Sequence, residues 1–111
     1  MPEPRIKAGL WVKIALRMGQ ADGRFAAVLR KGDPDSGGIL TVLRGRRGLS
    51  VLSQVRTAEG EAAWLRATGP DPVDQAQADA YVARQIGFDP DLWVLEFEVA
   101  DFLPPFDGKI V

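Results

Sequence analysis

The stretch Trp93-Val94-Leu95-Glu96-Phe97-Glu98-Val99 decides the fold of this chain. Its odd positions are large and apolar, and they alternate with Val94 and two glutamates. Successive side chains of a strand point to opposite faces, so the pattern predicts a strand with the odd positions in the core and both glutamates on the other face. Asp89-Pro90-Asp91, just before it, predicts the turn that leads into this strand.

A helix is expected before that turn, between residues 71 and 87. Asp71 and Pro72 are typical of a helix start, because a carboxylate accepts hydrogen bonds from first-turn amides and proline needs no donor there. Gly87 is typical of a helix end. A stripe of small apolar residues would let the helix lie close to a sheet: Val73, Ala76, Ala80 and Ala83.

Four further stretches predict strands. Residues 25–29 are continuously apolar, which is typical of a strand buried on both faces. Residues 39–44 and 49–56 are separated only by Gly45-Arg46-Arg47-Gly48, and so short a connection predicts an antiparallel hairpin. Residues 62–68 form the fourth stretch.

Residues 6–20 fit two patterns. Apolar residues alternate from Ile6 to Met18, which suits a strand. A helical projection also works, and Ala, Leu, Lys, Arg and Met favour helices. Its expected apolar face comprises Leu10, Trp11, Ile14, Ala15 and Met18. We favour the helix, and the strand stays open at this point.

These elements predict an α+β fold: a twisted antiparallel sheet of four to five strands with two helices packed on it. The length of 111 residues suits a single domain covering residues 1–111. Residues 101–111 are apolar but interrupted by Pro104 and Pro105, so we expect a proline-broken tail on the surface of the domain.

The composition excludes several kinds of chemistry. The chain has no cysteine and no histidine, which removes disulfides, thiolate nucleophiles and histidine-based catalysis. Four carboxylates lie close together in the sequence: Asp89, Asp91, Glu96 and Glu98. They lack the spacing of a calcium loop, and turn chemistry and a solvated strand face explain them. We therefore predict no catalytic residue, no metal site and no cofactor.

Charge is unevenly distributed along the chain. Residues 1–56 hold 11 basic and 4 acidic residues (net +7), whereas residues 57–111 hold 3 basic and 11 acidic residues (net -8). We expect the two halves to interleave in one domain, so that opposite charges become neighbours. No aromatic and basic cluster typical of a nucleic-acid face accompanies the basic half.

Two candidate binding sites remain. Arg44, Arg46 and Arg47 surround the predicted hairpin turn, and their guanidinium groups suit a small anion or a nucleic acid. Phe102, Leu103 and Phe106 suit an apolar interface with a second copy or a protein partner, while a tail folded back on its own domain fits equally well.

Three functional classes follow from these features. We rank a non-enzymatic interaction or assembly module first, with a homodimer as one form of it. A domain binding a small anion or nucleic acid comes second, and a carboxylate-dependent enzyme comes third. No stretch is long enough to span a membrane and no signal peptide is evident, so we expect a cytoplasmic protein without a membrane partner.

Several segments resemble one family of small bacterial proteins of unknown function, typical of alphaproteobacteria. They are Trp11-Val12, Arg17, residues 25–33, Gly37 and Phe88-Asp89-Pro90-Asp91-Leu92-Trp93-Val94-Leu95-Glu96. The part from Phe88 to Val94 is the most specific, whereas the Gly45–Gly48 connection and the proline-rich tail depart from the family pattern. The resemblance implies the α+β fold, a helix near the N-terminus and a cytoplasmic setting in a bacterium. It implies no catalytic residue.

Overall fold

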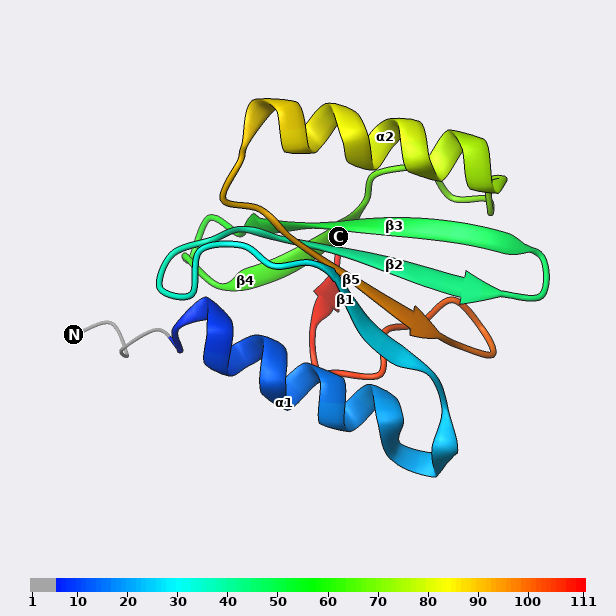
Figure 1. The fold of residues 1–111 in the computed structure, drawn as a ribbon, viewed down its shortest axis with the longest axis horizontal. Coiled ribbons are helices and arrows are strands. Elements are labelled where there is room, and N and C mark those ends of the chain that lie inside the picture. The colour runs from blue at the N-terminus through cyan, green and yellow to red at the C-terminus, as the bar shows by residue number, and fades with distance from the viewer. Residues whose placement is uncertain (1–5) are drawn as a thin grey trace.

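The computed structural model describes residues 6–111 and places its two α-helices on opposite faces of an open sheet (Figure 1). The elements in chain order are α1 (Ala8–Gln20), the 3-10 helix η1 (Ala21–Gly23), β1 (Ala26–Arg30), β2 (Ile39–Gly45), β3 (Gly48–Arg56), β4 (Ala62–Arg66), α2 (Gln75–Phe88), β5 (Trp93–Glu98) and β6 (Lys109–Ile110). The strand order is β1-β5-β2-β3-β4-β6. In the described part of the chain, no helix has the length and apolar character that crossing a membrane requires.

The sheet is mixed, which corrects the expected antiparallel sheet of four to five strands. β5 lies between β1 and β2, antiparallel to the first and parallel to the second. β6 is parallel to β4, and the remaining pairs are antiparallel. The helix α2 joins β4 to β5 as a crossover, which is the connection that parallel strands need. β6 has only two residues, too few to show an alternating pattern in the sequence.

The alternation of β5 is confirmed, because the two faces of this central strand belong to two separate cores. Trp93, Leu95 and Phe97 are buried on the α1 side, and Val94 is buried on the α2 side. The face expected to be solvated is therefore covered by α2 over much of its length. Glu98 is exposed, but the side chain of Glu96 retains only 12% of its accessible surface.

The helix expected over residues 6–20 is confirmed as α1, but its buried face differs from the projection. The residues that face the sheet are Ala8, Val12, Ala15 and Gly19. These small side chains bring the helix close to the sheet: a Cβ on Gly19 would overlap the Phe97 ring. Leu10, Ile14 and Met18 consequently point to solvent, so their expected place in the core is wrong.

The start of α2 also differs from expectation. Asp74, rather than Asp71, is the N-cap: its Oδ1 accepts the Gln77 N–H at 2.8 Å, and Gln77 Oε1 accepts the Asp74 N–H at 3.2 Å. This reciprocal pair is a capping box. The residues just before it continue the sheet, since Val73 and Leu49 exchange backbone hydrogen bonds of 2.8 and 2.9 Å.

The continuously apolar residues 25–29 form an edge strand, so the expected burial on both faces is wrong. Only one side of β1 is paired, by β5. Phe25, Val28 and Leu29 are exposed, while Ala26 is buried. An apolar run therefore does not distinguish a central strand from an edge strand whose apolar side chains face solvent.

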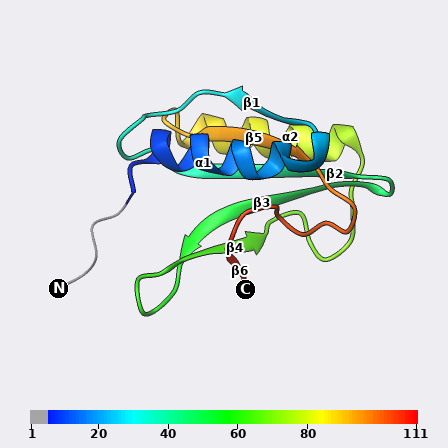
Figure 2. The ribbon, with the colours of Figure 1, turned by 90° about the horizontal axis from the view of Figure 1, so that it is seen from below.

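The C-terminal tail folds back over the sheet on the α1 side and ends with β6 beside β4 (Figure 2). Phe106 is only 6% exposed. Its ring lies 5.0 Å from Trp11, 5.1 Å from Trp64 and 5.6 Å from Phe97, measured between ring centroids. The tail thus completes the core that α1 begins.

Candidate interaction surface

Of the three arginines around the hairpin turn, Arg44 and Arg46 line one cavity and Arg47 lines another. The Arg44 guanidinium donates hydrogen bonds to Glu96 Oε1 at 2.9 Å and to Gln75 Oε1 at 2.8 Å. Arg46 and Arg47, at the tip of the turn, are exposed and line different hollows of the surface. The turn itself is the antiparallel hairpin that the sequence predicts, with Gly45 opposite Gly48.

Arg46 shares a cavity with Arg24, and nothing in the sequence indicates that these two arginines lie close together. A cavity of about 760 Å³ is lined by Arg24, Arg44 and Arg46, together with Glu98. Arg24 follows η1 and is distant in sequence from the turn, so only the pairing of β1 with β5 brings it here. Two guanidinium groups without a described ion pair therefore face this cavity, Arg24 and Arg46.

The three apolar tail residues have separate environments. Phe106 belongs to the core, as described above, and is not part of an exposed surface. Phe102 is half-buried, and its carbonyl accepts a hydrogen bond from the Arg66 guanidinium at 2.9 Å. Leu103 is 52% exposed, so it alone of the three offers most of its side chain to a partner.

The four carboxylates near β5 do not converge. Asp89 Oδ1 accepts the Asp91 N–H at 3.0 Å, which is the turn chemistry expected there. Glu96 is held by Arg44 on the α2 side. Across residues 6–111, no group of three or more Asp and Glu side chains is arranged to hold a metal ion.

The outer side of α1 carries an exposed apolar stripe. Leu10, Ile14 and Met18 are 55%, 44% and 40% exposed, and their spacing of four residues places them in line along the helix. Lys13 and Arg17 flank the stripe, and α1 contains no acidic residue. The inner face of this helix is already packed on the sheet, so these side chains do not serve the core. Contiguous exposed apolar side chains of this kind are typical of interaction sites.

A groove lies between α1 and the edge strand β1, and we call it the β1 groove. Its volume is about 550 Å³. The apolar residues that line it are Leu10, Val12, Leu16, Val28, Pro34 and Trp93. The charged residues that line it are Lys7, Lys13, Lys31 and Asp35. An apolar floor with a basic rim can accept an apolar side chain and an anionic group together.

Two of the three lysines at the β1 groove form no ion pair with the described residues. Lys7 Nζ lies 3.5 Å from Asp35 Oδ1, and both side chains are largely exposed, so this ion pair contributes little to stability. Lys13 and Lys31 make no ion pair with the described residues. The groove therefore carries excess positive charge beside its apolar floor.

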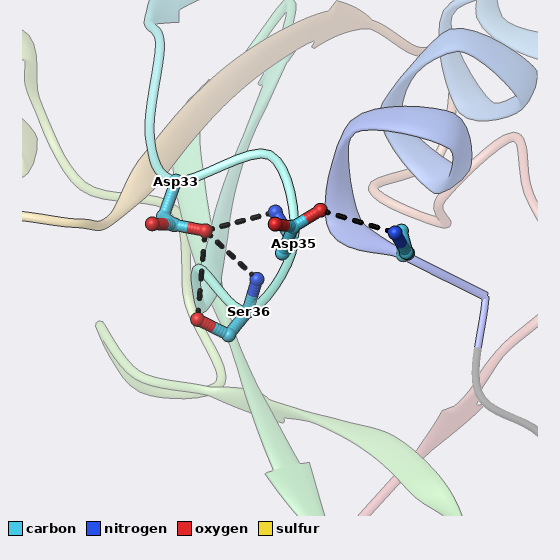
Figure 3. Close-up of polar contacts among 4 residues, drawn as sticks. Asp33, Asp35 and Ser36 are labelled. Atoms are coloured by element: carbon cyan, nitrogen blue, oxygen red, sulfur yellow. Dashed lines mark hydrogen bonds and ion pairs between the residues drawn. The ribbon is translucent and has the colours of Figure 1, made fainter.

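One wall of the β1 groove belongs to a loop centred on Asp33. Figure 3 shows the polar contacts of Asp33 within this loop. Asp33 Oδ1 accepts the backbone N–H groups of Asp35 at 2.8 Å and Ser36 at 3.0 Å. These backbone hydrogen bonds, first that from Ser36 and then that from Asp35, hold the pKa of Asp33 below its ordinary value. The charged form of Asp33 therefore stabilises this conformation of the loop.

The same loop joins α1 to β5. The Pro34 carbonyl accepts the Gly9 N–H at 2.8 Å, in the first turn of α1. The Asp33 carbonyl accepts the indole N–H of Trp93 at 2.8 Å, at the start of β5. A Cβ on Gly32 would overlap the Asp91 carbonyl and approach the Trp93 ring to 2.6 Å, so the close approach requires glycine. The wall, the helix and the floor of the groove are thus held in one arrangement.

Sequence reasoning missed both the stripe and the groove. Lys31 comes from a different segment than Lys7 and Lys13, and no motif connects them. A signal was present in residues 6–20, where apolar residues occur on all sides of the helix and no acidic residue occurs. A helix that is packed on one face has no structural need for apolar residues on the other.

Comparisons with known proteins agree with the fold. The family model described as "Protein of unknown function (DUF1491)" matches residues 6–107. The crystal structure of a DUF1491 family protein from Caulobacter crescentus CB15 is similar with a TM-score of 0.85 and 28% identity, covering 96% of this chain and 100% of that chain. The NMR structure of a DUF1491 family protein from the same organism gives the same TM-score of 0.85 and identity of 28%, covering 98% and 99%.

A solution structure of a protein from A. tumefaciens has a TM-score of 0.79 and 24% identity over 95% of each chain, a similarity that shows the fold alone. No curated protein matches the sequence. The family match covers nearly the whole of the described chain, from the residues before α1 to the tail that closes the core. This chain therefore belongs to the DUF1491 family of proteins of unknown function.

Proposed function

We propose that this protein is a non-enzymatic interaction module that docks an acidic, apolar segment of a partner protein on the side formed by α1 and β1. The observation that supports it most is the exposed stripe of Leu10, Ile14 and Met18 on a helix whose inner face is already packed. The stripe is flanked by Lys13 and Arg17, and the β1 groove next to it adds Lys31, which makes no ion pair with the described residues. An acidic segment would satisfy these charges.

A second copy of the chain fits this surface less well. A twofold pair of antiparallel α1 helices centred on Ile14 would be isologous, so each flank of one helix would meet the same flank of its partner. Lys13 and Arg17 lie on one flank of the stripe, and the pair would gather four cations there. Like charges brought together at a contact oppose association, which favours an acidic partner over self-association.

The cellular setting is part of the proposal. We expect the module to act in the cytoplasm of a bacterium. The family member from Caulobacter crescentus supports the bacterial setting.

Site-directed photo-crosslinking in the host cell tests this function. A photoreactive phenylalanine at Ile14 should give one discrete cross-linked protein, while the same residue at Arg84, exposed on α2, should not. The joint change of Lys13→Glu and Arg17→Glu should abolish the product, whereas Arg46→Glu with Arg47→Glu should leave it intact. Mass spectrometry should map the cross-link to an acidic, apolar segment.

Three results would contradict the proposal. A product of two copies of this chain would show self-association instead. A cross-link to lipid without any protein would indicate a membrane surface. A product that survives charge reversal at Lys13 and Arg17 would show that the basic flank plays no part.

A second candidate function rests on the cavity shared by Arg24 and Arg46. Two guanidinium groups facing one cavity suit a small anion or a polyanion backbone. Retention on heparin should then fall when Arg24 and Arg46 become alanine, and should change less when Arg47, which faces a different hollow, becomes alanine. Equal retention of all three proteins would exclude this candidate.

A further inference from the structure

We infer that β1 is the docking edge itself: an extended partner segment, with acidic and apolar residues in alternation, adds to the sheet as a new strand beside β1. This inference rests on the proposed function, because it specifies the partner class and the binding mode on the same side of the molecule. Strand addition takes its affinity from main-chain hydrogen bonds and its specificity from hollows that receive alternate side chains. β1 offers both.

The outer edge of β1 carries backbone groups without a partner strand. The Phe25 carbonyl accepts the Glu98 N–H at 3.0 Å, so Phe25, and Ala27 two residues later, turn their backbone groups toward β5. Ala26 and Val28 therefore turn theirs away from the sheet. The side chain of Gln20 occupies one of these groups, donating to the Ala26 carbonyl at 3.2 Å. The amides of Ala26 and Val28 and the Val28 carbonyl remain for an incoming strand.

Hollows flank this edge on both faces of the sheet. On the α1 face, Val28 lines the β1 groove. On the α2 face, a smaller cavity of about 170 Å³ is lined by apolar residues that include Leu29, Val82 and Ile86. Side chains of an added strand point alternately to the two faces. One set would enter the β1 groove, and the other would cover the exposed Leu29.

The charges around β1 determine which partner side chains suit each face of the sheet. Lys13 and Lys31 lie at the β1 groove, so acidic side chains suit the α1 face. The α2-face cavity is lined largely by apolar side chains, so apolar residues suit that face. A second copy of β1 does not meet this requirement: antiparallel pairing would bring Arg24, before the strand, toward Lys31 of the other chain. Like charges opposite one another destabilise strand pairs.

A titration with a synthetic peptide in which glutamate and valine alternate tests the binding mode, followed by two-dimensional NMR of the labelled protein. The amides of Ala26 and Val28 should shift and become protected from exchange. N-methylation of the peptide at every second residue blocks the hydrogen bonds of one strand edge, and methylation on the edge facing β1 should weaken binding roughly tenfold or more. A peptide alternating lysine and valine should not bind.

Protein variants provide the matched control. Val28→Pro removes an outward amide that β5 does not use, and proline is tolerated at such edge positions. Val28→Ala keeps the amide and loses the same side chain. The proline variant should bind the peptide roughly tenfold more weakly than the alanine variant. The N-methylated peptides test the same bond on the unmodified protein, so the result does not depend on how the proline variant folds.

Binding that is equally strong after methylation of either peptide edge would overturn strand addition. So would shifts confined to α1, or absence of binding. If cross-linking at Ile14 still maps to an acidic partner in those cases, the proposed function stands and only the binding mode fails. If neither experiment detects an acidic partner, both fail.

Discussion

At the scale of the residue, Thr41 is one of two side chains, with Arg30, whose buried polar atom has no hydrogen-bond partner among the described residues. It is fully buried between β3 and β5, and its hydroxyl has no hydrogen-bond partner among the described residues. A buried hydroxyl without a partner carries an uncompensated desolvation cost. We expect Thr41→Val to raise the free energy of unfolding by about 1 kcal/mol. Urea unfolding measures it, with Thr41→Ser as a control that keeps the hydroxyl and loses the methyl group. A less stable Thr41→Val protein would contradict this reading.

Phe106 and Leu103 show how neighbouring apolar residues of one tail differ in role. Phe106→Ala should lower the free energy of unfolding by about 3–5 kcal/mol, because it leaves a cavity among Trp11, Trp64 and Phe97. Leu103→Ala should change it by less than about 0.5 kcal/mol, because Leu103 is mostly exposed. Thermal and urea unfolding of both proteins provide the comparison. Equal losses at the two positions would show that the tail is not packed as described.

At the scale of the element, the start of α2 depends on a single cap. Asp74→Ala removes the capping box and should lower the free energy of unfolding by about 1 kcal/mol. Asp71→Ala is the matched control, because Asp71 is exposed and accepts no described hydrogen bond from the helix. If Asp71→Ala is the more costly change in urea unfolding, the helix begins earlier than Gln75.

The loop centred on Asp33 should make stability depend on pH. Its folded-state pKa lies below the ordinary value of 3.8, so the folded chain holds the charged form more strongly than the unfolded chain does. The contribution is present above that ordinary value and is lost as the pH falls through the lowered pKa. Asp33→Asn lacks this charge, so the difference in melting temperature between the two proteins should shrink below pH of about 4. A difference that persists unchanged into acid would show that the carboxylate charge is not involved.

The sequence predicts which segments form helices and strands better than it predicts which of their faces are buried and which strands pair. The alternation of residues 93–99 and the short Gly45–Gly48 connection identify β5 and the β2–β3 hairpin, because both signals are local. The predictions of which faces of α1 and β1 are buried were wrong for the same reason. Both elements carry apolar residues on all sides, so hydrophobicity alone does not indicate which side meets the sheet, and close packing at Gly19 decided it. Parallel pairing and β6 depend on contacts between distant segments.

At the scale of the whole molecule, the two oppositely charged halves of the sequence interleave, as expected. β5, from the acidic half, lies between β1 and β2 of the basic half. The charges are nevertheless not uniformly mixed, because α1 carries only basic charges and the loop after β1 adds Lys31. The candidate site follows from this arrangement, and it was not predictable from adjacent residues. Arg46 and Arg47 are adjacent in sequence but line different hollows, whereas the β1 groove brings Lys31 beside lysines of a separate segment.

The central claim is that excess positive charge at the β1 groove selects an acidic partner. The most direct test compares the affinity of the alternating glutamate–valine peptide for three proteins by calorimetric titration. Docking at the groove predicts that Lys13→Glu with Lys31→Glu weakens binding roughly tenfold or more relative to the unmodified protein. Arg46→Glu with Arg47→Glu, which changes the net charge equally at the hairpin turn, should leave the affinity unchanged. Equal weakening in both variants, or no weakening in the first, would contradict the claim.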